Sequence, residues 1–85
     1  MESEMLPLED AVKFTEKLAS ENCQILGIER FICNDRSAMP DLNAIADFSS
    51  LETGNVVLSL HSAREYFAQF GKDEKEVFTV VYQLF

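Results

Sequence analysis

The stretch CQILGIERFIC, residues 23–33, decides the fold that we expect for this chain. Successive side chains of a β-strand point to opposite faces, so a strand in this position has apolar residues on both sides. One face carries Leu26, Ile28 and Ile32, and the other carries Ile25 and Phe31. A strand that is apolar on both faces is typical of the centre of a sheet. Gly27 within it predicts either a bulge or a close approach by the preceding helix.

We expect that helix to occupy the residues before the strand. Pro7 suits the first turn of a helix, and Glu9 and Asp10 place carboxylates at its positive N-terminal end. The helix is expected to run to Ser20 or Glu21. Its apolar stripe consists of Leu8, Val12, Thr15, Leu18 and Ala19.

The segment after the strand allows two interpretations. Asn34 and Asp35 predict a turn. Pro40 and Asp41 suit the start of a short helix over residues 41–48. The same residues also alternate as in a strand, with apolar side chains at Leu42, Ala44, Ala46 and Phe48. We favour a strand, antiparallel to the first one.

Two further elements complete the chain. Asn55 suits the N-cap of a second helix that ends near Phe70, with Gly71 at its C-terminal stop. The closing stretch EVFTVVYQLF, residues 76–85, is rich in β-branched and aromatic residues and predicts a strand. We therefore expect an α+β fold of two layers. A small, mainly antiparallel sheet of three to four strands would carry two helices packed on one face. The 85 residues form one domain in this interpretation, with residues 1–5 disordered.

The net charge of the chain limits the classes of ligand that it can bind. The chain has 15 acidic and 7 basic residues, which give a net charge of -8. Nucleic acids and anionic membrane surfaces are bound through clustered Lys and Arg, so both are excluded as general ligands. The stretch between Arg36 and Arg64 has no Lys or Arg, yet it contains Asp41, Asp47 and Glu52. Such a surface suits a positively charged protein, although acidity also keeps a small protein soluble.

Localisation follows from the apolar pattern and the N-terminus. No apolar run approaches the roughly 20 residues that cross a bilayer, and MESEM is acidic where a secretory signal is basic. We expect a cytoplasmic protein with reduced cysteines. An extended segment would hold Cys23 and Cys33 roughly 30 Å apart, whereas a disulfide needs Cα atoms within about 7 Å.

Catalytic motifs are sparse. His61 and Glu65 are four residues apart on the second expected helix, where a base and its orienting group, or two metal ligands, would share a face. A zinc site needs three or four ligands, and the chain offers a single histidine and two cysteines. The sequence contains neither a phosphate-binding glycine loop nor a nucleophile elbow. We therefore expect no enzyme activity, no metal and no cofactor, and a solvent-facing His61.

Three stretches together resemble a bacterial family. The string ILGI at residues 25–28, the segment PDLNAIADFSSL and the closing EVFTVVYQLF are similar to the small immunity proteins of the colicin class that neutralises tRNA-cleaving toxins. The resemblance covers most of the chain as architecture. It implies a leading helix, an antiparallel sheet and no catalytic chemistry. Family members that bear tryptophan differ from this chain, which has none.

The resemblance implies a bacteriocin-type inhibitor that fills the basic cleft of a ribonuclease toxin, with carboxylates standing where RNA phosphates bind. The candidate toxin-binding residues are Glu29, Asp35, Asp41, Asp47 and Glu52. Phe31 and Tyr82 are candidate aromatic anchors. The alternative is a self-associating structural or adaptor domain that forms a homodimer through its last strand.

Overall fold

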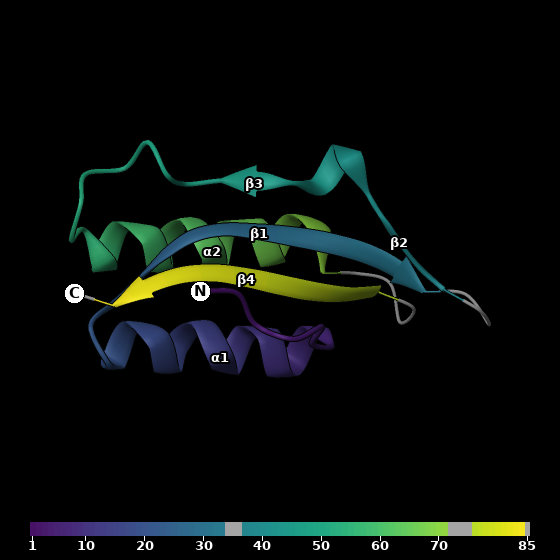
Figure 1. Cartoon of the computed structure of the whole chain (residues 1–85), viewed down its shortest axis with the longest axis horizontal. Helices are drawn as coiled ribbons and strands as arrows, with labels where there is room; N and C mark the ends of the chain where they lie inside the picture. Colours follow the sequence, from purple (N-terminus) through teal and green to yellow (C-terminus); the bar gives the residue numbers. More distant parts are fainter. Residues whose placement is uncertain (34–36, 72–75, 85) are drawn as a thin grey trace.

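The computed structural model describes residues 1–33, 37–71 and 76–84. Over these residues the chain forms two α-helices and a four-stranded antiparallel sheet (Figure 1), and the predicted α+β class is confirmed. The elements in chain order are α1 (Leu8–Ser20), β1 (Cys23–Cys33), β2 (Ala38–Pro40), the 3-10 helix η1 (Leu42–Ala44), β3 (Ala46–Asp47), α2 (Val56–Phe70) and β4 (Glu76–Leu84). The predicted turn at Asn34 and Asp35 lies outside the described residues.

Strand β1 is the centre of the sheet, as its sequence predicts. One edge pairs with β4 from Cys23 opposite Leu84 to Ile32 opposite Glu76. The other edge pairs with β3 and, further along, with β2. The register of β1 and β4 shifts between Ile25 and Gly27, which is the bulge that Gly27 suggested. Both cysteines of β1 are free thiols.

The close neighbour of Gly27 is β3 and not a helix. A Cβ atom on Gly27 would lie 2.9 Å from the backbone oxygen of Ala46. This distance is shorter than real Cβ atoms tolerate, so the approach of β3 to β1 depends on a glycine here.

Both helices match their predicted ranges. Pro7 precedes α1, and Glu9 and Asp10 occupy its first turn. Helix α2 is capped by Asn55, whose side chain accepts a hydrogen bond from the N–H of Leu58 at 3.1 Å. Local sequence signals therefore suffice to place the ends of both helices.

The preference for a strand over residues 41–48 was wrong for its first half. Asp41 Oδ1 accepts a hydrogen bond from the N–H of Asn43 at 3.0 Å, and the Asp41 carbonyl accepts one from the N–H of Ala44 at 3.0 Å. These bonds close η1, and only Ala46–Asp47 remains extended as β3. The alternating apolar residues predicted strand pairing here, but the capping bond of the Asp41 side chain favours a helical turn instead.

The N-terminus also differs from the expectation of disorder. Residues 1–6, which we call the strap, lie along the edge of β4 that faces away from β1. The N–H groups of Ser3 and Leu6 donate to the carbonyls of Val80 and Phe78, each at 2.8 Å. The edge of a strand leaves backbone N–H and C=O groups without hydrogen-bond partners, and the strap provides partners for those of β4.

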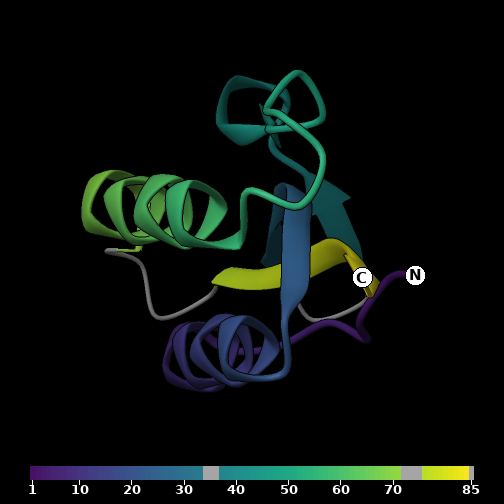
Figure 2. The same ribbon diagram turned by 90° about the vertical axis from the view of Figure 1, so that its left-hand side faces the viewer.

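Aromatic side chains form the core between the helices and the sheet. Phe78 of β4 is fully buried, and its ring meets Tyr66 and Phe67 of α2 edge to face, with centroids 6.0 and 5.3 Å away. Tyr82, on the same side of β4, meets Phe14 of α1 at 5.4 Å. Figure 2 shows the two helices next to each other beside the strands.

A charged cluster joins three segments beside this core. The Arg30 Nε atom donates to Glu76 at 2.6 Å, and its Nη1 atom donates to Asp41 at 2.6 Å. The side chains of Arg30 and Glu76 are 15% and 1% exposed. Burial alone would lower the pKa of Arg30, but the hydrogen bonds that it donates to Glu76 and Asp41 outweigh burial and raise that pKa. The cluster therefore fixes η1 and β4 to the central strand.

We expect Arg30→Ala to lower the free energy of unfolding by about 3–5 kcal/mol, because it removes the guanidinium that compensates a buried Glu76 carboxylate. Arg64→Ala is the matched control. It breaks the solvent-exposed pair with Glu16 that links α2 to α1, and we expect little change. Chemical denaturation of both variants measures the difference. Equal midpoints for the two variants would contradict a structural role for Arg30.

Candidate functional site

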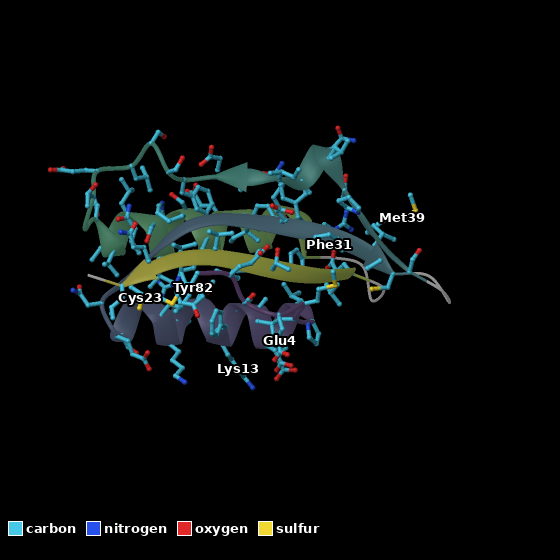
Figure 3. All side chains as sticks on the ribbon, viewed as in Figure 1. Glu4, Lys13, Cys23, Phe31, Met39 and Tyr82 are labelled. Carbon is cyan, nitrogen blue, oxygen red and sulfur yellow. The ribbon has the colours of Figure 1, made fainter. Side chains whose placement is uncertain are left out.

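The side of the sheet opposite Phe78 and Tyr82 carries the candidate site. Strand alternation places Val77, Thr79 and Val81 of β4 on this side. Their register partners on β1 are Phe31, Glu29 and Gly27. Figure 3 shows Tyr82 near α1, whereas Phe31 lies toward the β2 end of the molecule.

A hollow of about 380 Å³ opens between β1, β3 and β4, and we call it the acidic hollow. It is lined by Leu26, Gly27, Ile28, Glu29, Ile45, Ala46, Asp47, Ser49 and Val81. Its floor is aliphatic, and its two charged side chains are both carboxylates. Because Gly27 pairs with Asp47 and Glu29 is two residues further along β1, the close approach of β3 sets their spacing.

Asp47 is held in its charged form. One of its oxygens accepts hydrogen bonds from the Ser49 hydroxyl at 2.5 Å and from the Ser49 N–H at 2.9 Å. These two bonds lower the pKa of Asp47, the hydroxyl contributing more. Asp47 therefore keeps its negative charge to a lower pH than an ordinary aspartate.

The basic side chains of the described residues are engaged elsewhere. Each contacts a carboxylate: Lys13 with Glu9, Lys17 with Glu21, Arg30 with Asp41 and Glu76, and Arg64 with Glu16. Lys and Arg are absent from the lining of the acidic hollow. Within the described part of the chain, the ion pairs do not involve Glu29 or Asp47.

The five predicted toxin-binding residues separate into groups. Glu29 and Asp47 come together in the acidic hollow. Asp41 lies beside η1 with its carboxylate bound by Arg30, which gives it a structural role. Glu52 is exposed in the loop before α2 and does not line the hollow. Asp35 lies outside the described residues.

The sequence analysis missed three exposed apolar side chains on β2, on η1 and just before β3, of which Ile45 lines the acidic hollow. Met39, Leu42 and Ile45 are 60%, 77% and 49% exposed. Figure 3 shows Met39 projecting from β2. Alternation had grouped Leu42 with Ala44, but η1 separates them: Ala44 is buried, and its carbonyl accepts a 2.5 Å bond from the Tyr66 hydroxyl. Asp41, as a cap, was the signal that could have revealed this turn.

Thr79 adds an unsatisfied group to this side of the sheet. Its side chain is 5% exposed, and its hydroxyl oxygen has no hydrogen-bond partner among the described residues. Its register partner is Glu29 of the acidic hollow. Buried hydroxyls almost always have a partner, so this one lowers stability in the isolated chain.

The predicted His61 and Glu65 pair does form. Their side chains approach to 3.0 Å on α2, and both are exposed. Glu65 lines a second hollow of about 290 Å³ between α2 and β3, together with Phe48, Tyr66 and Phe70. The described residues contain no group of three or more His, Cys, Asp or Glu side chains placed to hold a metal ion.

Comparisons of this chain with known proteins identified no relative. No protein-family model, curated protein or solved structure matches this chain. Among the described residues, no helix has the length and apolar character needed to cross a membrane. The site is therefore interpreted from its own geometry.

We expect Thr79→Val to raise the free energy of unfolding by about 1 kcal/mol, because valine has nearly the same shape and removes the unsatisfied hydroxyl. Thermal and chemical denaturation measure the change. Thr15→Val serves as the control, since the Thr15 hydroxyl donates to the Val12 carbonyl at 2.8 Å. A loss of stability in Thr79→Val would show that its hydroxyl is satisfied.

Proposed function

We propose that this chain is a non-catalytic inhibitor that binds a basic protein through the acidic hollow. The observation that carries the proposal is the pair Glu29 and Asp47, which lies over an aliphatic floor without a described cation to neutralise it. Cationic side chains of a partner would meet these carboxylates. Charge complementarity of this kind accelerates association and selects the partner.

The exposed apolar residues favour a protein as the ligand. Ile45 lines the acidic hollow, and Leu42 lies on the adjoining η1. Both are exposed and offer area that a folded partner would bury at the centre of an interface, with Glu29 and Asp47 beside it. An apolar centre with charged neighbours is typical of protein interfaces. A small cation would use the carboxylates and leave the apolar area in water.

The expected partner is a nuclease toxin, in line with the resemblance to colicin-type immunity proteins. A ribonuclease binds RNA through a basic cleft, and a protein with net charge -8 is electrostatically complementary to such a cleft. Occupation of the cleft would block RNA without any chemistry by this chain. The inhibitor would then act stoichiometrically in the producing bacterial cell.

Purified tRNA-cleaving domains of colicin-type toxins test the proposal. We expect an equimolar amount of the chain to stop tRNA cleavage by the cognate domain, and added salt to weaken the complex. Absence of both binding and inhibition for all such domains at micromolar concentration would overturn the nuclease assignment.

The double substitution Glu29→Lys with Asp47→Lys locates the site. We expect it to weaken binding of the inhibited domain by about 100-fold or more, because two attractive contacts become repulsive. Asp10→Lys with Glu21→Lys makes the same change in net charge at the two ends of α1 and is the control. Equal affinities of the two variants would place the contact surface elsewhere.

Leu42→Asp tests the apolar contact. We expect at least a tenfold loss of affinity for the same toxin domain, because a carboxylate would replace a side chain that the partner desolvates. Val57→Asp is the control: Val57 is 82% exposed at the start of α2 and does not line the acidic hollow. Isothermal titration calorimetry compares the two, and a similar loss in both variants would count against an interface at η1.

A further inference from the structure

The second hollow lies between α2 and the segment that contains β3, and one face of α2 forms most of its wall. Its lining consists of Ala46, Phe48, Ser62, Glu65, Tyr66, Gln69 and Phe70. The members on α2 recur with the spacing i, i+3, i+4, i+7 and i+8, which places them on one face of the helix. Opposite this face, the N–H of Phe48 donates to the carbonyl of Leu26 at 2.8 Å, which holds Phe48 beside the central strand. Two separate elements therefore shape the hollow.

The lining combines aromatic rings with hydrogen-bond acceptors. The rings are those of Phe48, Tyr66 and Phe70. The acceptor oxygens belong to a hydroxyl, a carboxylate and an amide, from Ser62, Glu65 and Gln69. The described lining contains neither Lys nor Arg. The ligand that matches both kinds of group is a cation that carries hydrogen-bond donors and also packs against aromatic rings.

Glu65 supplies the negative charge of this lining. Its Oε1 atom lies 3.0 Å from Nε2 of His61, and both side chains are exposed. That contact uses one of the two carboxylate oxygens, and an ionised carboxylate accepts further hydrogen bonds at the other. The carboxylate and the rings lie on adjacent positions of α2, because Tyr66 directly follows Glu65. A cation bound by Glu65 would therefore lie close to an aromatic ring.

A guanidinium group has the properties that this lining requires. Its planar fork of N–H groups binds a carboxylate through two hydrogen bonds, it stacks on aromatic rings, and it is more weakly hydrated than an ammonium group. A lysine ammonium is compact and strongly hydrated, so it gains less from the rings. The volume of about 290 Å³ suits a side chain better than a large cofactor. Among the described residues, no group of three or more metal-ligating side chains is placed to hold a metal ion.

We propose that the second hollow receives an arginine side chain of the partner protein. This inference rests on the proposed function, which requires a basic partner. Ala46 lines both hollows, and its neighbours separate: Asp47 lines the acidic hollow and Phe48 lines the second hollow. One partner surface would therefore cover both sides of β3. The described lining of the acidic hollow contains no aromatic residue, so the second hollow matches an arginine better.

NMR titration of the full chain with N-acetyl-arginine N-methylamide tests the site without a toxin. We expect saturable shifts of the backbone amides of residues 46–48 and 62–70. The citrulline analogue has nearly the same shape without the charge, and we expect its Kd to be at least tenfold higher. Glu65→Gln and Phe48→Leu should each raise the Kd of the arginine probe at least fivefold. Glu52→Gln is the control, because it removes one charge outside the hollow and should leave that Kd unchanged.

The same variants then distinguish this inference from the proposed function. In a complex with an inhibited tRNA-cleaving domain, we expect Glu65→Gln to weaken binding at least tenfold and Glu52→Gln to have little effect. Saturable binding of the probe at the second hollow would support the arginine site even if no such domain were inhibited, which would be a failure of the proposed function alone. Equal shifts with the arginine and citrulline analogues would overturn the inference. Shifts centred on residues 26–29 would do the same, and so would a complex whose affinity Glu65→Gln leaves unchanged.

Discussion

The ion cluster of Arg30 is the interaction on which the rest of the structure depends. Its guanidinium extends from the central strand and binds carboxylates from β4 and from the residue before η1. Removing a guanidinium from water is unfavourable unless good hydrogen bonds replace its hydration, and here two short ones do. The Tyr66 hydroxyl adds a second attachment at Ala44, and burial raises the pKa of that phenol, so it remains a donor. These two contacts attach η1, and with it the start of β3 in the wall of the acidic hollow, to the central strand and to α2.

Much of the fold could be predicted because its signals are local. Pro7, Asn55 and Gly71 place the helix ends, and the apolar alternation of residues 23–33 and 76–84 places the two long strands. Residues 38–54 and the strap are different. Asp41 is a local signal for η1, but the positions of these segments against β1 and β4 depend on contacts with residues distant in sequence, and no periodicity reports those contacts.

Some residues of the candidate site could also be predicted from the sequence, and others could not. Asp47 belongs to the stretch without Lys or Arg, and Glu29 to the end of the first predicted strand; both line the acidic hollow. Counting charges could not show that Asp41 is engaged, since its partner Arg30 precedes it by 11 residues on another strand. It also could not show that Leu42 faces water, because this follows from η1. A sequence gives the number of charges, and the fold decides which of them are neutralised within the molecule.

Gly27 has a consequence for how such a protein would change over evolutionary time. Glu29 and Asp47 are only partly buried or exposed, so replacing either alters the surface and leaves the fold intact. The glycine has no such latitude, since one additional carbon would push β3 away from the central strand. Substitutions at Glu29 or Asp47, with Gly27 retained, would let a lineage acquire a new binding partner while its fold persists.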